Sequence, residues 1–236
     1  SSLESAINYN EIYVQLMLLN LCIYTPSNYI FPSKLDKYMD LTHNKGANLT
    51  QKGREQGIRR LMSINLLKRL ESSVHSFSLT LSRIRDLITH TIETIDSFDL
   101  DVYEATDNDF DMDDGNTDYF SVGKKVKIDL GDMDYKSWRA ELKQDADVLE
   151  LLTLMVADIT PEYDTKLQTL LSLISDKIEK PINGDNKKIL IFSAFSDTAE
   201  YLFDHVSSFA KKKYGLDTAL VTGSVDGKST VKGLKA

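Results

Sequence analysis

The sequence predicts a mainly α-helical protein, in which a bundle of long antiparallel helices is followed by a small α/β unit with a parallel sheet. Two observations predict this division. Apolar residues recur at helical spacing through most of residues 65–178, and short continuous apolar runs of strand length follow after residue 187. The turn-forming sequence KPING at 180–184 separates the two patterns, so we place a domain boundary near residue 183.

Length and composition indicate a soluble protein with enough material for a sizeable core. The chain has 236 residues, 42% of them hydrophobic, and no apolar run approaches the roughly eighteen residues of a membrane helix. Cys22 is the only cysteine and the four histidines lack metal-ligand spacing, so neither disulfides nor a thiolate metal site is expected. We therefore expect a cytoplasmic protein with no membrane partner.

The first 64 residues are predicted to form short helices. Residues 7–20 alternate apolar and polar positions at helical spacing. Pro26 and Pro32 end that pattern, because proline disfavours helical backbone at the residue before it. Further helices are expected at 34–39 and at 53–63, and the second can join the next helix directly.

The most regular pattern lies between residues 65 and 95. Apolar residues follow one another there at spacings of three and four, which is typical of a long helix packed lengthwise on other helices. The residues of this seam are Leu67, Leu70, Val74, Phe77, Leu81, Ile84 and Ile88. A single helix of about thirty residues would form a rod of roughly 45 Å.

The net charge of −8 conceals two regions of opposite sign. Residues 96–118 contain ten acidic side chains, no basic ones and few apolar ones, which predicts a mobile loop. Residues 34–85 contain eleven Lys or Arg and four acidic residues. This basic excess fits a phosphate-facing surface, and a solvated helical face explains it as well.

Two aspartate groups resemble metal-binding sequences without satisfying them. The sequence DFDMD at 109–113 begins like a calcium loop, but Phe120 stands where the bidentate glutamate is required. The three aspartates of IDLGDMD at 128–134 are close enough in sequence for a metal, and a turn leading into the next helix explains them as well. We expect no metal site.

Two more helices are predicted before the domain boundary. Residues 135–157 place apolar side chains on one helical face, and residues 160–178 do the same. Thr160 is the expected cap of the second helix and Pro161 lies in its first turn, where the missing N–H costs nothing. Matching apolar faces on these helices and on 65–95 predict an antiparallel bundle.

The C-terminal region predicts the beginning of a parallel sheet. Residues 188–192 (KILIF) and 216–222 are short apolar runs, as expected of strands that are buried on both faces. Ser196 is the expected cap of an intervening helix at 197–213. Strand, helix and strand form a right-handed βαβ unit, and two strands alone do not make a stable sheet, so further strands are expected to complete the domain.

No active site is evident in the sequence. The sequence GSVDGKS at 223–229 resembles the phosphate loop GxxxxGK[ST], but three residues rather than four separate its glycines, which shifts the backbone N–H groups that would hold phosphates. A polar connection is the preferred interpretation. No pairing of a nucleophile with a base, and no carboxylate pair, stands out.

Five sequence blocks stand out in order along the chain. They are NLLKRLESSVHSF (65–77), DMDYKSW (132–138), DTKL (164–167), KKILIFSAFSDTAEYL (187–202) and ALVTGS (219–224). In this order they resemble a bacterial SNF2-type helicase-related protein of superfamily 2. The fourth block is the most specific, because it is similar to the motif that opens the second RecA-like lobe of these motors.

The resemblance implies a division of the chain. Residues 1–64 would be the end of the first motor lobe or its helical extension, residues 65–182 the helical insertions, and residues 183–236 the start of the second lobe. The family's phosphate loop, DExx box and arginine fingers have no counterpart in this sequence. The resemblance therefore implies no catalytic residue and no cofactor in this chain, which would be inactive alone, while ATP and Mg²⁺ would serve the parent protein.

The resemblance also implies partners and contact residues. The partners would be DNA, as a duplex bound without regard to sequence, together with the missing first lobe and the remainder of the second lobe. Loops at the carboxyl ends of parallel strands suit phosphate oxygens. The implied nucleic-acid-binding residues are Ser193, Phe195, Thr222, Gly223, Ser224, Lys68 and Arg69.

Two alternatives remain open from the sequence. Lys68 and Arg69 can equally belong to a solvated patch on a helix. The whole chain can also be a helical scaffold that binds protein partners and has no nucleic-acid role. Binding that weakens steeply with salt would distinguish a DNA-binding chain from such a scaffold.

Overall fold

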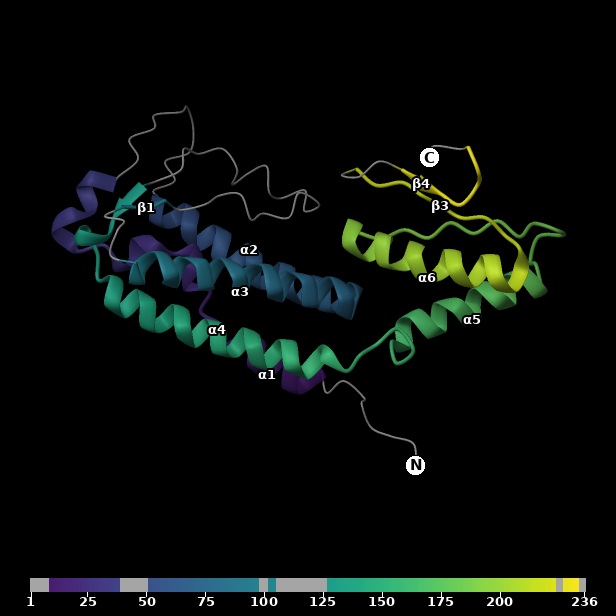
Figure 1. The fold of residues 1–236 in the computed structure, drawn as a ribbon, viewed down its shortest axis with the longest axis horizontal. Coiled ribbons are helices and arrows are strands. Elements are labelled where there is room, and N and C mark those ends of the chain that lie inside the picture. The colour runs from purple at the N-terminus through teal and green to yellow at the C-terminus, as the bar shows by residue number, and fades with distance from the viewer. Residues whose placement is uncertain (1–8, 39–50, 98–101, 105–126, 224–226, 234–236) are drawn as a thin grey trace.

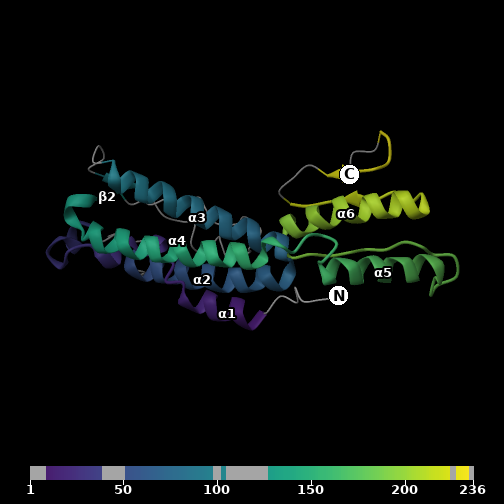
Figure 2. The ribbon, with the colours of Figure 1, turned by 60° about the horizontal axis from the view of Figure 1, so that its bottom comes forward.

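The computed structural model describes residues 9–38, 51–97, 102–104, 127–223 and 227–233. The protein is mainly helical, as the apolar pattern predicts. Its α-helices are α1 (Tyr9–Leu18), α2 (Gln51–Ser72), α3 (Val74–Asp96), α4 (Tyr135–Ala157), α5 (Thr165–Glu179) and α6 (Ser196–Tyr214). Helices α2, α3 and α4 lie lengthwise beside one another, and α5 and α6 form a second pair beyond one end of them (Figure 1, Figure 2).

The predicted rod is a helical hairpin. Only Ser73 separates α2 from α3, and the two helices pack against each other. Ser73 has extended backbone (φ −156°, ψ 148°), and its hydroxyl accepts a hydrogen bond from the N–H of Ser76, which caps α3. The seam residues are buried except Leu67, which is half-buried. One continuous helix over 65–95 is therefore wrong, because the apolar spacing runs unbroken through a turn that ends the first helix.

Helix α4 packs on α3 and encloses the main core. It has the predicted bounds, and Asp134 caps it by accepting a hydrogen bond from the N–H of Ser137. Its predicted apolar face is buried throughout, as shown by Trp138, Leu142, Leu149, Leu152 and Val156. These side chains share one core with the apolar residues of α1, α2 and α3. Residues from the expected first and second domains therefore contribute to a single core.

Buried carboxylates fix the N-terminal segment to this bundle. After α1 the chain forms the 3-10 helices η1 (Cys22–Tyr24), η2 (Pro26–Tyr29) and η3 (Pro32–Tyr38). Asp145 of α4 accepts hydrogen bonds from the backbone N–H groups of Asn20 (2.8 Å) and Cys22 (2.9 Å). Glu55 of α2 accepts them from the N–H (2.9 Å) and the hydroxyl (2.7 Å) of Ser27. Such bonds offset the cost of burying the charges.

Two short strands lie between α3 and α4. Strand β1 (Val102–Glu104) pairs antiparallel with β2 (Lys127–Asp129), with Val102 opposite Asp129. The sequence at 109–113 that resembles a calcium loop, and most of the acidic stretch 96–118, lie outside the described residues.

Helix α5 begins at Thr165 rather than at Thr160. Its cap is Asp164, whose carboxylate accepts hydrogen bonds from the N–H groups of Lys166 and Leu167, both at 3.1 Å. The predicted cap, Thr160, lies in the preceding turn, where its carbonyl accepts from the N–H of Asp164. The apolar face of α5 packs on α6 in a smaller second core centred on Ile174, Ile178 and Val206.

The expected parallel sheet is not observed among the described residues. Residues 188–192 form no strand, and Leu190 and Phe192 are 84% and 89% exposed. Strand β3 (Ala219–Leu220) pairs antiparallel with β4 (Lys228–Ser229) instead. A strand with apolar side chains on both faces needs neighbours on both edges, and this segment has none here.

The two ends of α6 differ in how the backbone enters and leaves the helix. Helix α6 begins at Ser196 with Phe195 at the cap position, so Ser196 is not the cap that the sequence predicts. Gly215 ends α6 in the left-handed region (φ 67°), where glycine has no steric penalty. None of the described helices combines the length and the apolar composition that a membrane crossing requires.

Candidate functional site

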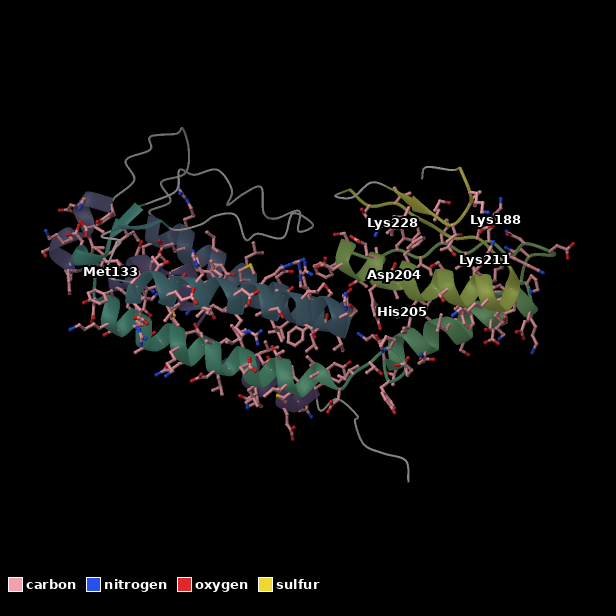
Figure 3. All side chains as sticks on the ribbon, viewed as in Figure 1. Met133, Lys188, Asp204, His205, Lys211 and Lys228 are labelled. Atoms are coloured by element: carbon pink, nitrogen blue, oxygen red, sulfur yellow. The ribbon has the colours of Figure 1, made fainter. Side chains whose placement is uncertain are left out.

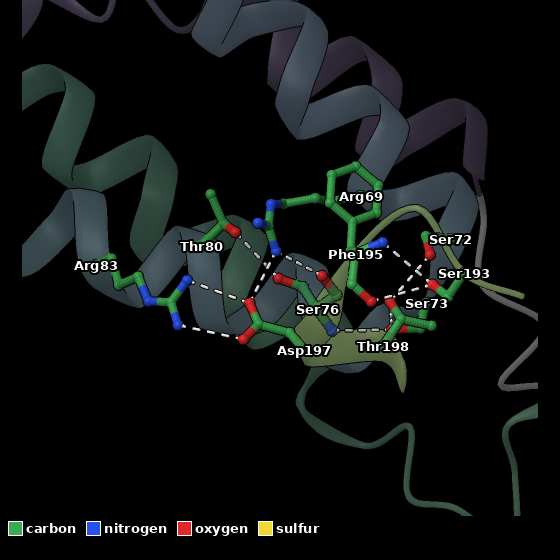
Figure 4. Close-up of polar contacts among 10 residues, drawn as sticks. All are labelled: Arg69, Ser72, Ser73, Ser76, Thr80, Arg83, Ser193, Phe195, Asp197 and Thr198. Carbon is green, nitrogen blue, oxygen red and sulfur yellow. Dashed lines mark hydrogen bonds and ion pairs between the residues drawn. The ribbon is translucent and has the colours of Figure 1, made fainter. Parts of the chain in front are cut away.

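Three of the five sequence blocks meet where the α2–α3 turn contacts the start of α6. Figure 4 shows the residues of the first and fourth blocks at this contact. The first block supplies the turn and the fourth supplies residues 193–198. The third block, DTKL, contacts both: Tyr201 on α6 donates a hydrogen bond to Asp164, and Lys166 donates to the carbonyl of Glu71. Segments that are up to about 130 residues apart in sequence therefore form one local structure.

Arg69 lies at the centre of this structure. It is fully buried, with 0% of its surface exposed. Its Nη1 donates to the hydroxyl of Ser76 (2.7 Å) and to Oδ2 of Asp197 (2.9 Å). Its guanidinium carbon lies 4.6 Å from the centroid of the Phe195 ring, within the range of a cation–π interaction. A buried guanidinium needs a carboxylate partner, and Asp197 is that partner.

Asp197 also binds a second arginine. Arg83, on α3, donates from Nη1 to Oδ2 (3.2 Å) and from Nη2 to Oδ1 (3.4 Å) of the same carboxylate. Arg83 is half exposed at its side chain (54%), whereas the Asp197 side chain is 17% exposed. Helices α2 and α3 thus hold the first turn of α6 from two directions.

Hydroxyl groups form a second set of contacts at the turn. The hydroxyl of Thr198 lies 2.9 Å from that of Ser72 and 3.2 Å from that of Ser73. Ser73 and Thr198 are buried away from water, so these contacts help to satisfy the hydrogen-bonding capacity of their hydroxyls. The Ser193 hydroxyl bonds to the backbone of Phe195, accepting from its N–H (3.2 Å) and donating to its carbonyl (3.1 Å). The 193–197 loop therefore has a defined shape.

A cavity of about 460 Å³ adjoins this contact, between α3, α6, the end of α4 and the connection from α4 to α5. Asp204 and His205 line it from α6 (Figure 3). The ring of Tyr201 stacks on His75 at 4.8 Å and meets the edge of His205 at 4.7 Å. Burial and the hydrogen bond to Asp164 raise the pKa of Tyr201. The phenol therefore stays a donor at neutral pH.

The structure buries some of the predicted nucleic-acid-binding residues and exposes others. It brings Arg69 and Phe195 together in the interior, where neither is presented to solvent. Lys68 and Ser193 are exposed. Thr222 and Gly223 follow β3, and Ser224 lies outside the described residues. Lys68, Ser193 and Gly223 are therefore open to solvent, whereas Arg69 holds the 193–197 loop in place through Phe195 and Asp197.

Sequence reasoning missed Arg83, Asp197 and Thr198. Asp197 and Thr198 lie within the fourth block, and we expected them only to start a helix. Arg83 follows the turn by ten residues, and nothing in its spacing indicates a partner on α6. The available signal was chemical: the run of Ser72, Ser73 and Ser76 near Arg69 is unusually polar for a helix that carries a core seam.

The alternative ligand sites receive no support from the described residues. Lys228 lies in β4, and its ammonium binds Glu200 on α6 at 3.0 Å. Residues 224–226 of the sequence that resembles a phosphate loop lie outside the described residues. Asp129 and Asp134 cap their local turns, and Asp132 is bound by Lys37. In the described part of the chain, no group of His, Cys, Asp and Glu residues could hold a metal ion.

Comparisons with known proteins found no matching family model, no matching curated protein and no matching solved structure.

Proposed function

We propose that this chain is the central part of an SNF2-type ATP-dependent DNA helicase or translocase. It would supply helical insertions and the beginning of the RecA-like second lobe, which grips DNA. One observation carries the proposal: the KRLESS sequence of the first block and the FSAFSDTAEYL sequence of the fourth pack directly together through Arg69, Phe195 and Asp197. This contact joins the two blocks that the resemblance assigns to the helical insertions and to the second lobe.

In this proposal the Arg69 cluster is a mechanical connection between the helical insertions and the second lobe. The lobe would begin at α6 and the segment before it, and its loop 193–197 would be held by the hairpin turn. Movement of the lobe would then move α2 and α3 with it, because the contact includes a buried charge pair. ATP and Mg²⁺ would bind to motifs that residues 1–236 do not contain, so we expect no ATP hydrolysis by this chain alone.

DNA contact would come from the exposed and half-buried members of the predicted set. Lys68 supplies a charge, and Ser193, Thr222 and Gly223 supply hydroxyl or backbone N–H groups of the kind that position phosphates. Such contacts carry no base information, so the binding would be independent of sequence.

The test is salt-dependent binding of a fluorescein-labelled duplex, measured by anisotropy. We expect weak binding that falls steeply with salt, and a slope of log affinity against log salt that Lys68→Ala reduces by about one. Lys143→Ala, an exposed lysine of α4, is the matched control and should leave the slope unchanged. Absence of binding, or binding insensitive to salt, would contradict the proposal.

A specific observation favours the alternative of a helical scaffold that binds protein partners. The outer face of α1 is apolar and exposed at Tyr13 (51%), Val14 (57%), Met17 (68%) and Leu18 (57%). When the outer face of a helix is apolar as well as its inner face, another part of the protein or a partner normally covers the outer face. Protein binding that resists salt and is lost in Met17→Glu would favour this alternative.

A further inference from the structure

A groove of about 560 Å³ lies beside α5 and α6. One wall is the segment 185–191, and the other is the segment 216–219, which leads into β3. Apolar side chains of the two helices lie between these walls, namely those of Ile174, Ile178, Val206 and Ala210. The first wall runs along the two helices without forming a helix itself, and Lys188 marks its position (Figure 2, Figure 3).

The first wall is unusually apolar for an exposed segment. Leu190 is 84% exposed and Phe192 is 89% exposed, while Ile189 and Ile191 are 37% and 42% exposed. Four consecutive apolar residues are typical of a strand that other strands cover, and contiguous exposed apolar surface generally marks an interaction site.

The backbone of both walls is largely available for pairing, although the N–H of Lys188 donates to the Asn186 side chain and that of Leu216 donates to the Ala210 carbonyl. Within residues 127–223, no backbone hydrogen bond joins 188–192 to another segment. Strand β3 bonds to β4 along one edge, and its side of the groove carries no strand among the described residues. Each wall therefore presents alternating N–H and C=O groups, whose partial charges are complemented by another extended backbone.

These features identify the kind of occupant. A helix has no free backbone groups along its length to pair with the walls. Nucleic acid would place its phosphates over the apolar side chains of α5 and α6. The phosphates would then lose water that hydrates them, which is energetically costly. An extended polypeptide satisfies both requirements, because its backbone pairs at the edges while alternate side chains point to one face.

We propose that this groove accepts one extended polypeptide strand, which pairs with residues 188–192 on one side and with β3 on the other. The strand presents an apolar face to Ile174, Ile178, Val206 and Ala210. Residues 188–192 and β3 are then not neighbours in the completed sheet, because the added strand lies between them. The inference rests on the groove and not on DNA binding, so the two proposals can fail separately.

The probe is a fluorescein-labelled synthetic peptide, KVTVTVTVK, in which valines alternate with threonines so that one face is apolar. Its matched control has the same side chains and N-methyl groups on every second amide, which remove the donors of one edge. We expect anisotropy to show saturable binding of the first peptide. The methylated peptide should bind at least about tenfold more weakly, because two or more of the backbone hydrogen bonds made by the first peptide are lost.

Two variants of the chain test the location. Ile189→Lys charges one wall and Ala210→Lys charges the helical side, so both should abolish binding. Ile189 is partly exposed, so its substitution tests the site even if Ala210→Lys impairs folding. Leu173→Lys is the control, because this residue is also apolar and 60% exposed on α5 but does not line the groove.

The outcomes separate clearly. Binding that requires free amides, survives Leu173→Lys and is lost in Ile189→Lys supports the proposal. No binding, equal binding of the methylated peptide, or unchanged binding to a folded Ile189→Lys variant overturns it.

Discussion

At the scale of single residues, buried charges determine which segments are held together. Asp145 and Glu55 hold the segment 20–29 at one place, and Arg69 with Asp197 holds the start of α6 at another. Removing one partner of a buried, satisfied charge costs more than the pair contributes in total, because the remaining charge keeps its desolvation penalty. These groups therefore specify the arrangement more than they add to its net stability.

Asp132 gives the chain a predictable response to acid. It accepts hydrogen bonds from Lys37 (2.6 Å) and from the hydroxyl of Tyr38 (2.7 Å), which lower the pKa of its carboxyl from 3.8 to about 2. An acid with a lowered pKa in the folded state contributes stability above its ordinary pKa. That contribution is lost as the pH falls from about 4 through about 2.

We expect Lys37→Met to lower stability at neutral pH and to flatten the loss between about pH 4 and pH 2, since the largest cause of the pKa shift is removed. The measurement is the urea midpoint as a function of pH, followed by circular dichroism. Lys143→Met, on the exposed side of α4, should reproduce the wild-type profile. A Lys37→Met profile that stays as steep as wild type would show that the pair does not act in this way.

At the scale of elements, the turn between α2 and α3 depends on one hydroxyl. Ser73 caps α3 and also meets Thr198. We expect Ser73→Ala to lower the free energy of unfolding by about 1 kcal/mol, the usual cost of losing an N-terminal cap, with some addition from the unpaired Thr198 hydroxyl. Urea unfolding measures it. Ser82→Ala, inside α3, should cost nothing, and equal effects of the two substitutions would argue against the cap.

The same turn shows why the sequence predicts some elements well and others badly. Helix α4 was predictable to its ends, because its apolar face has one period and Asp134 is a strong cap. The α2–α3 turn was not, because both helices carry the same apolar spacing and the register passes through Ser73 without a break. Apolar spacing identifies helical residues and does not reveal where one helix ends and the next begins.

Tertiary context explains the remaining differences. Asp164 replaces Thr160 as the cap of α5, and its carboxylate also accepts from Tyr201 of α6, a contact invisible in sequence. The composition of residues 188–192 is typical of a strand. A segment forms a strand, however, only where the backbone of another segment pairs with it. In the candidate site the sequence pointed to Arg69 and Phe195 individually, but their contact depends on the hairpin turn, which the predicted rod excluded.

At the scale of the whole molecule, two cores of unequal size are joined by a small polar contact. The main core is shared by α1, α2, α3 and α4, whereas the second is centred on three residues of α5 and α6. Free energy of local opening follows the apolar surface buried, so α6 should open at lower free energy than α3. The contact around Asp197 couples the two parts.

This coupling leads to a prediction for native-state hydrogen exchange. In Asp197→Ala the carboxylate that binds both Arg69 and Arg83 is lost. We expect the opening free energy of the α6 amides to fall by about 2 kcal/mol, the typical contribution of hydrogen bonds to charged groups. Amides between Phe77 and Ile88 should change less, because their protection comes from the main core. Ser208→Ala, an exposed position of α6 away from the cavity, should leave both regions unchanged. An equal fall in the opening free energies of the α3 and α6 amides would mean that the two cores open together. Helix α6 would then not open independently of the main core.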